Sequence, residues 1–297
     1  NVYWLTTGIS DGLRMREKDG TLGASTVLTY FNTTSRGEDD LVYWSRIPVP
    51  TTIPSEEELD HWFAGYVRAP GSSSTDDFIV ALDGLAVAAP PYSATLRGVL
   101  VGVDNDAATG PYEHSVNVYL NGQLVHEGQW LGEGEYSFEE TDIPHSDLVD
   151  GDNTVTVECL LSNPTVAALD LVRVNWFEID YHRTYTTEND MLFFDGDDEG
   201  TWRHEVGEFL TSTIEVFDVT DPFSVTRFIS ITVEDTGSYT LKFRDAIWDE
   251  RHYLALTPSQ YKSPVDIVED SPSDLRSTSN GADYIIVTHA DFYTDVL

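Results

Sequence analysis

The chain has 297 residues, of which 52 are acidic and 16 are basic, so its formal net charge is −36. A field of this sign repels the phosphates of nucleic acids and the headgroups of anionic lipids, which excludes nucleic acid as an expected partner. Hydrophobic residues make up 40% of the chain and aromatic residues 12%, enough to fill a globular core. The acidity therefore belongs to the surface and not to a disordered tail.

The hydrophobic runs of the sequence are all too short to span a membrane, and no basic segment followed by an apolar one opens the chain. A chain that starts at Asn1 and not at Met is explained either by a secretory signal that has been removed or by trimming, and the sequence leaves both open. An acidic surface with only three Lys suits saline or calcium-bearing surroundings, where cations screen the repulsion between carboxylates. We expect a secreted protein, located outside the cell or on the cell surface.

Short strands dominate the beginning of the chain. The segments "NVYWLTTG", "STVLTYFNTT" and "DDLVYWSRIPVP" each combine β-branched and aromatic residues and are bounded by turn-forming residues. We assign residues 1–54 to an N-terminal β segment that packs on the sandwich that follows. Ser55 and Glu58 then form a capping box, which predicts a short helix or turn.

Residues 55–185 are predicted to form a jelly-roll-like β-sandwich. Alternation of apolar and polar residues, interrupted by turn signals, recurs in "FIVALDGL", "SATLRGVLVGV", "GEYSFEE", "NTVTVECLL" and "LDLVRVNWFEIDYHRTY". The clearest element is "SVNVYLNGQLVHEG", since Asn121 and Gly122 supply the two positive-φ positions of a tight hairpin turn.

A smaller β-sandwich is predicted for residues 186–262, where "DMLFFDGDDEGTWRHEVGEF", "STIEVFDVTDPFSVTRFISITVED" and "GSYTLKFRD" repeat the rhythm of strands and turns. Residues 263–297 are predicted to be a linker and the start of an α/β domain. The run "ADYIIVTHA" is typical of a strand buried on both faces of a sheet, and Asp291 follows as the N-cap of a helix. The predicted fold is therefore mainly β, with two sandwiches followed by the first strand and helix start of an α/β domain.

An ordered set of motifs in the chain resembles a known family. The set comprises "NVYWLTTG" with "GLRMRE", the pair "LVYW…DHWF", "HSVNVYLNGQLVHEGQW", "VRVNWFEIDYHRTY", "IEVFDVTDP" and "ADYIIVTHADF". In this order they resemble the region upstream of the catalytic domain in gingipain-type cysteine peptidases, in particular the large secreted members related to the sortase-like peptidase of the type nine secretion system. The resemblance covers nearly the whole chain. It implies that the α/β domain that begins near the end of the chain is caspase-like.

The resemblance also implies that the chain carries no catalytic residue. The catalytic His and Cys of the family lie downstream of the "ADYIIVTHADF" segment, beyond Leu297, and neither His289 nor Cys159 corresponds to them. The residues themselves agree, because Cys159 is the only cysteine and lies in the predicted strand "NTVTVECLL". A thiol among apolar residues behaves as a small hydrophobic group, and no neighbouring His is present to activate it.

Two acidic loops are candidate Ca²⁺ sites. In "FDGDDEGTW", Asp195, Asp197 and Glu199 alternate between glycines that turn the loop, and such a loop can present several oxygens to the ion. In "VDNDAATG", Asp104 and Asp106 lie between two predicted strands. The alternative for both loops is an acidic turn on an acidic protein, and any bound ion is expected to be structural.

Other constellations favour structural interpretations. The eight histidines are scattered, without a pair at zinc-ligand spacing, and His114 beside Glu113 is interpreted as a turn residue. Adjacent carboxylates such as Glu139 and Glu140, or Asp76 and Asp77, point to opposite faces of a strand and cannot flank one glycosidic bond. Three aromatic residues are candidates for stacking on sugars, with core packing as the alternative: Trp62, Trp130 and Tyr136.

Two functional hypotheses follow from the sequence. In the first, the chain is the non-catalytic N-terminal part of a secreted gingipain-like peptidase and acts as a pro-region, folding aid or substrate-presenting module. Its partner is then the downstream catalytic domain or a separate chain that carries it. In the second, the chain is a self-standing extracellular module that binds a protein or glycan, as a carbohydrate-binding jelly roll, or that assembles into a surface layer or filament. Fold alone does not decide between them.

Overall fold

The computed structural model describes residues 12, 14–44, 61–86, 92–103, 112–161, 169–196, 199–269, 277 and 279–281. The regular structure of this part consists of strands and two short 3₁₀ helices, which confirms the prediction of a mainly β fold. Asn1–Gln260 form one compact unit and Tyr261–Leu297 a second. Within the described ranges, no helix has the length and apolar character needed to cross a membrane.

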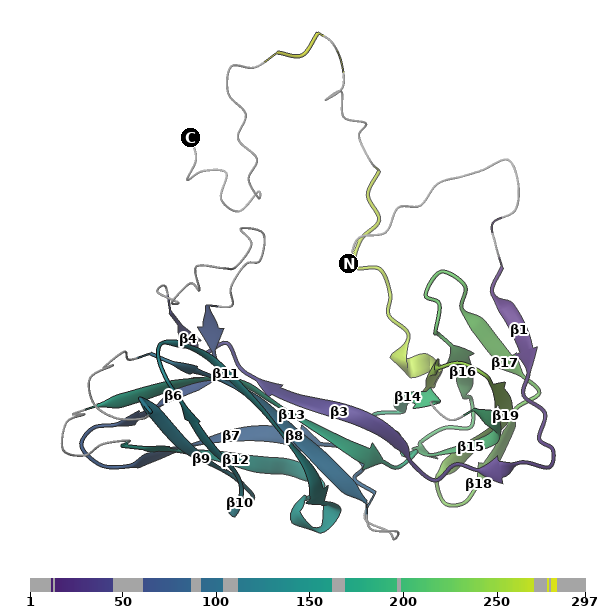
Figure 1. The fold of residues 1–297 in the computed structure, drawn as a ribbon. Coiled ribbons are helices and arrows are strands. Elements are labelled where there is room, and N and C mark those ends of the chain that lie inside the picture. The colour runs from purple at the N-terminus through teal and green to yellow at the C-terminus, as the bar shows by residue number, and fades with distance from the viewer. Residues whose placement is uncertain are drawn as a thin grey trace. The chain divides into compact units, whose positions relative to one another are not determined.

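The first sandwich consists of two facing sheets (Figure 1). One sheet has the strand order β11 (Gly134–Pro144), β8 (Ser93–Gly102), β13 (Asp170–Arg183) and β3 (Phe31–Glu38), and β6 (Gly65–Ala69) also pairs with β13. The other has the order β10 (Gln123–Trp130), β9 (His114–Leu120), β12 (Gly151–Leu160) and β7 (Ser74–Leu82). A 3₁₀ turn, η1 (His145–Asp147), leads from β11 toward β12. The predicted hairpin is confirmed, because β9 and β10 pair antiparallel around Asn121 and Gly122, whose φ angles are 49° and 83°.

The second sandwich also has two sheets. Its five-stranded sheet has the order β1 (Arg16–Asp19), β17 (Thr226–Ile229), β16 (Glu215–Asp218), β20 (Arg251–Leu256) and β14 (Met191–Gly196). Its four-stranded sheet has the order β18 (Thr232–Asp235), β19 (Tyr239–Ile247), β15 (Gly200–Phe209) and β2 (Thr26–Val27). A 3₁₀ turn, η2 (Pro258–Gln260), follows β20.

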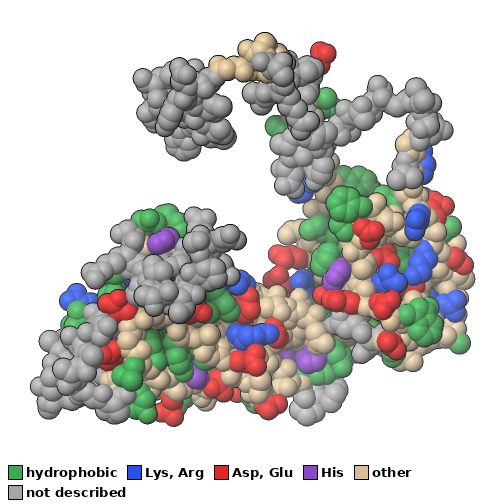
Figure 2. Space-filling view, turned by 45° about the horizontal axis from the view of Figure 1, so that its top comes forward, with side chains coloured by type: hydrophobic (Ala, Val, Ile, Leu, Met, Phe, Trp, Pro, Cys, Tyr) green, Lys and Arg blue, Asp and Glu red, His purple; other side chains and the backbone are tan. Residues whose placement is uncertain are grey.

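Charged side chains lie mostly at the surface, as the composition predicted. Figure 2 shows acidic side chains scattered over the face in view, with basic side chains between them. Among the described Asp, Glu, Lys and Arg residues, four are buried: Asp170, Arg173, Asp190 and Asp245. A buried charge is costly unless it is paired, so the partners of these four side chains are informative.

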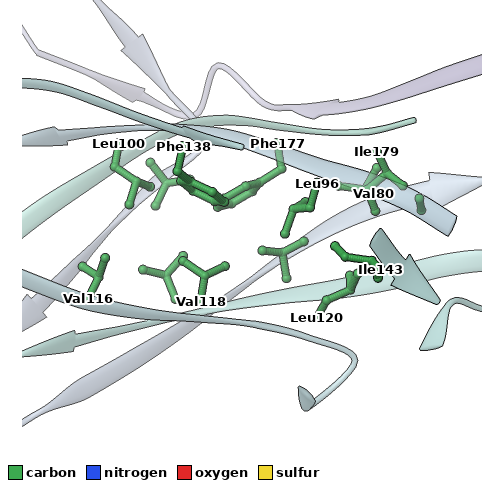
Figure 3. Packing of buried hydrophobic residues seen from close by; sticks show 14 of the residues in the cluster. Val80, Leu96, Leu100, Val116, Val118, Leu120, Phe138, Ile143, Phe177 and Ile179 are labelled. Carbon is green, nitrogen blue, oxygen red and sulfur yellow. The ribbon is translucent and has the colours of Figure 1, made fainter. Parts of the chain in front are cut away.

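The core of the first sandwich forms because apolar side chains alternate along its strands. Figure 3 shows Leu100, Phe138 and Phe177 from one sheet pointing toward Val116 and Val118 from the other. All five are buried in one cluster. Burial of a side chain of this size contributes about 1.5–3 kcal/mol, so this layer is a main source of stability.

The N-terminal segment divides between the two sandwiches, whereas the sequence placed all of residues 1–54 on the first. β3 joins the first sandwich, but β1 pairs in parallel with β17 and β2 with β15, both in the second sandwich. Polar contacts hold β1 there, since Lys18 Nζ lies 2.5 Å from Asp245 Oδ1. The four residues of β1 are polar, so their sequence has no apolar alternation that could have indicated a sheet.

Several predicted elements lie outside the described residues. They are the strand "NVYWLTTG", the capping box of Ser55 and Glu58, and the terminal strand "ADYIIVTHA" with Asp291. The start of a caspase-like domain therefore stays a prediction. So do the boundaries at residues 54, 185 and 262.

Candidate functional site

The residues of the predicted Ca²⁺ loops are only partly described. Asp195, at the end of β14, is half-buried, and its Oδ1 lies 2.6 Å from Nδ1 of His252. Glu199 is exposed just before β15, while Asp104, Asp106 and Asp197 lie outside the described residues. In the part of the chain that the structure describes, no three His, Cys, Asp or Glu side chains gather closely enough to hold a metal. Calcium at either loop stays a prediction.

Cys159 has the structural position that the sequence predicted. It lies on β12 with its side chain in the core of the first sandwich, and its exposed fraction is 0%. A thiol at this depth cannot reach a peptide bond in solution. The described residues thus provide no cysteine for nucleophilic catalysis.

A buried His–Asp pair was missed by the sequence interpretation. His114 is not a turn residue but opens β9, and its Nδ1 lies 2.7 Å from Oδ1 of Asp170 on β13. The two side chains are 0% and 2% exposed, and the indole ring of Trp130 covers the imidazole at 4.9 Å between centroids. An imidazole oriented by a carboxylate can act as a general acid or base in an enzyme. This pair is closed to solvent, however, and its role is to join the two sheets. Its residues are 56 positions apart, so no local motif could have indicated it.

The candidate site is a polar groove on the outer face of the β11–β8–β13–β3 sheet. It has a volume of about 410 Å³, within the range of ligand sites, and a mostly polar lining: Asn32, Thr33, Thr34, Ser93, Thr95, Asp180, Tyr181, His182 and Asp195. Strand register explains the assembly, because His182 pairs with Asn32, and Asp180 pairs with both Thr34 and Thr95. Three strands thus place polar side chains in adjacent rows.

One carboxylate of the groove is fixed by its neighbours. Asp180 accepts hydrogen bonds from the Thr34 hydroxyl at 2.7 Å and from Nη1 of Arg97 at 2.7 Å. The side chains of Asn32, Ser93 and Thr95 make no hydrogen bond with any described residue. The groove therefore combines a fixed carboxylate with uncommitted amide and hydroxyl groups, which suits a neutral ligand rich in hydroxyl groups.

An aromatic cluster borders the groove at His182. The ring of Tyr92 stacks on the imidazole at 4.5 Å, and Tyr30 contacts the same ring at 4.8 Å. Burial lowers the pKa of His182 below its usual value, and the neighbouring His145 lowers it further. A neutral imidazole can both donate and accept hydrogen bonds, which extends the polar lining.

The candidate sugar-stacking residues differ in accessibility. Trp130 and Tyr136 stack face to face at 4.5 Å and pack against the core of the first sandwich, in agreement with the core-packing alternative. Trp62 is 45% exposed. The carboxylates Glu139 and Glu140 diverge as predicted, because Glu139 pairs with Arg97 and Glu140 with His126. None of these residues lines the polar groove.

Comparisons with known proteins relate the chain to a solved structure. No family model and no curated protein matches the sequence. Among solved structures, the dimeric latent form of PorU from Porphyromonas gingivalis matches with a TM-score of 0.55 and 12% identity over 85% of this chain. The match covers 22% of the PorU chain.

Two structures from infectious bursal disease virus also match, but weakly. The VP2 subviral particle has a TM-score of 0.22 and the Gt strain one of 0.21, each at 10% identity. They cover 80% and 87% of this chain, and the chain covers 61% and 68% of theirs. Scores this low do not indicate a shared fold. The comparisons therefore show that this chain has a fold related to part of PorU.

Proposed function

We propose that this chain is the non-catalytic N-terminal part of a secreted gingipain-like cysteine peptidase and serves its catalytic domain as a pro-region or accessory module. The main support for this proposal is the structural similarity to PorU, a sortase-like cysteine peptidase of the type nine secretion system, over 85% of the chain. The ordered motifs of the sequence support the same assignment independently. The role of the parent enzyme comes from this likeness, since 22% of the PorU chain is matched.

The chemistry of the described residues is consistent with an accessory role. The thiol of Cys159 and the His114–Asp170 pair are both enclosed, so neither can act on a substrate. Peptide cleavage on this proposal belongs to residues beyond Leu297. The two sandwiches then supply surface for contact with the catalytic domain.

The first test is the intact mass of the polypeptide from its native source. A mass far above 33.2 kDa, with peptidase activity that is lost when the residues after Leu297 are deleted, is the expected result. A mass near 33.2 kDa, with no second chain held under native conditions, would overturn the proposal.

The polar groove supports a second candidate, an extracellular module that binds a glycan. Its uncommitted Asn32, Ser93 and Thr95 side chains offer hydrogen bonds to sugar hydroxyls. A panel of soluble polysaccharides tests this, with Thr95→Val as the variant that removes a groove hydroxyl and Thr156→Val as a control on another sheet. Binding that Thr95→Val weakens and Thr156→Val does not would support the candidate. No binding at millimolar concentration to any polysaccharide would count against it.

A structural Ca²⁺ at the loop of Asp195 and Glu199 is a further part of this proposal. A melting scan with and without a chelator tests it, because a ligand that binds only the folded state raises Tm. An unchanged transition would remove the ion from the proposal.

A further inference from the structure

Arg173 differs from the other buried charged residues in having no hydrogen-bond or ion-pair partner for its side chain among the described residues. Asp170 pairs with His114, Asp190 accepts a hydrogen bond from the backbone N–H of Leu210, and Asp245 pairs with Lys18. The side chain of Arg173 is equally buried, at 5% exposure, but makes no ion pair with any described residue. Its Nε and Nη1 atoms are buried, and no acceptor from the described part of the chain bonds to either.

Aromatic rings enclose the guanidinium of Arg173. The group lies 3.6 Å from the ring centroid of Trp44 and 5.6 Å from that of Phe63. Phe63 belongs to β5 (Trp62–Phe63), which pairs with β4 (Val42–Tyr43) in a two-stranded ribbon. Trp44 directly follows β4, and its backbone N–H donates to the His61 carbonyl. Stacking on a Trp face contributes on the order of 1–2 kcal/mol, but it satisfies none of the N–H groups in the guanidinium plane.

Arg36, in the same sheet as Arg173, also stacks on a Trp ring but has carboxylate partners as well. Arg36 lies 4.3 Å from the ring centroid of Trp176, and its guanidinium also pairs with Glu38 at 2.7 Å and Glu178 at 3.0 Å. Arg173 has the ring, but no carboxylate of the described ranges pairs with it. Because burial of an unpaired charge costs several kcal/mol, the arrangement at Arg173 is that of half an ion pair.

The surface next to Arg173 has the composition of a protein interface. Leu41 and Tyr43 on the β4 side and Trp62 on β5 are 73%, 57% and 45% exposed, and Tyr66, the register partner of Arg173 on β6, is 49% exposed. We call these four residues the ribbon face. Tyr, Trp and Arg are the residues that carry most binding energy in protein interfaces, so a large apolar group beside an anion fits this surface.

We propose that Arg173 and the ribbon face form a docking site for a Glu or Asp side chain of a partner polypeptide, and that this partner is the peptidase domain. The identity of the partner rests on the proposed function. The choice of a carboxylate as the partner group rests on charge complementarity. Arg173 is the one buried Lys or Arg among the described residues, and a buried cation is stabilised by an anion. A single carboxylate flanked by apolar groups fits better than a polyanion, which the net charge of −36 repels.

Thermal melting of the full chain tests the anion site without any peptidase. At equal ionic strength, about 0.2 M, acetate is expected to raise Tm above its value in chloride for the wild type and for Arg36→Met, but not for Arg173→Met. In chloride, Arg173→Met is expected to melt no lower than the wild type, because it removes an unpaired charge and keeps the apolar volume. An acetate effect that persists in Arg173→Met, or a fall of several degrees on that substitution, would overturn the site.

The chain itself carries acids that could pair with Arg173, and a variant distinguishes them. If Glu56→Gln, Glu57→Gln and Glu58→Gln together create an acetate effect that the wild type lacks, the anion comes from within the chain and the docking proposal is wrong. If acetate raises Tm of the wild type and of the triple variant equally, the site awaits an external carboxylate as proposed. If acetate raises Tm of neither, the anion site is wrong.

Complex formation then tests the occupant. On the proposed function the gene encodes a peptidase domain after Leu297, and this domain, expressed separately, is expected to bind the wild type and Arg36→Met equally. Arg173→Met and Trp62→Ala should weaken binding by about tenfold or more. Binding that neither substitution weakens would leave the proposed function standing and overturn this docking site. An absence of binding to all variants, with the acetate effect present, would overturn the peptidase domain as the occupant.

Discussion

The imidazole of His204 lies on β15 in the core of the second sandwich, at 0% exposure. It stacks on Phe243 at 4.8 Å, and neither ring nitrogen has a hydrogen-bond partner among the described residues. Burial lowers the pKa of His204 from 6.5 to about 3. The unfolded chain therefore takes up a proton below about pH 6.5 that the folded chain refuses until about pH 3. We predict that stability is full above pH 6.5 and falls by up to about 1.4 kcal/mol per pH unit toward pH 3.

The substitution His204→Phe tests this prediction, because it keeps the stacked ring and removes the proton site. Chemical denaturation at several pH values between 7 and 4 should show a flatter pH dependence for His204→Phe than for the wild type. His252→Phe is the matched control, since His252 stacks on Phe193 but is half-exposed. Equal acid sensitivity in the wild type and His204→Phe would show that other groups cause the loss.

At the scale of elements, the packing of β8 between its neighbours depends on Gly98. This residue is the register partner of Phe138 on β11 and of Phe177 on β13, and both rings lie over it. A Cβ atom at this position would lie 2.6 Å from Phe177 Cδ1 and 2.7 Å from Phe138 Cε1. We predict that Gly98→Ala lowers the free energy of unfolding by about 1–3 kcal/mol.

Gly207→Ala is the control for Gly98→Ala. Gly207 also lies in a strand, but the nearest atom to its Cβ position is Thr240 Oγ1 at 3.6 Å. Its substitution should change the free energy of unfolding by no more than about 0.5 kcal/mol. Equal effects of the two substitutions in denaturant titrations would contradict a specific role for the two rings.

The β9–β10 hairpin depends on Asn121 for more than its turn conformation. Its Nδ2 donates to the Asp147 carbonyl at 2.9 Å and to Asn153 Oδ1 at 2.8 Å, and its Oδ1 accepts from the Thr154 backbone N–H. We predict that Asn121→Ala costs about 2–3 kcal/mol, because it removes these bonds and strains a residue with φ of 49°. Asn121→Gly loses the same side-chain bonds but adopts the positive φ without strain. Its Tm should therefore lie between those of the wild type and Asn121→Ala. If Asn121→Gly melts like the wild type, the side-chain bonds contribute nothing.

For the whole molecule, the sequence predicted features that follow from local patterns, such as strands and tight turns. It did not predict contacts between residues that are far apart in the chain. Alternation gave the strands of both sandwiches, and Asn121–Gly122 gave the hairpin. The His114–Asp170 pair could not be predicted, because its partners meet only through the pairing of distant strands. The same holds for Arg173, whose burial depends on the β4–β5 ribbon. The placement of β1 follows from polar contacts that leave no periodic pattern in its sequence.

The balance of charge over the whole molecule predicts an unusual response to salt. Basic side chains are shared between acids, as Arg227 pairs with Glu17 and Glu215, and Lys242 with Glu205 and Glu234. With 52 acidic and 16 basic residues, repulsion between unpaired carboxylates outweighs these attractions. Raising NaCl from about 0.01 to 0.1 M shortens the screening length from about 30 to 10 Å, so it weakens long-range repulsion more than it weakens contacts.

We therefore predict that Tm rises by several degrees over this range of NaCl, whereas a protein held by attractive surface pairs would show a fall. The measurement is a thermal melt at each salt concentration, with CaCl₂ at the same ionic strength as a comparison. An additional rise in CaCl₂ that disappears in a variant with both Asp195→Asn and Glu199→Gln would assign that part to the predicted loop and the rest to screening. A Tm that falls with NaCl would contradict repulsion as the dominant electrostatic effect in this chain.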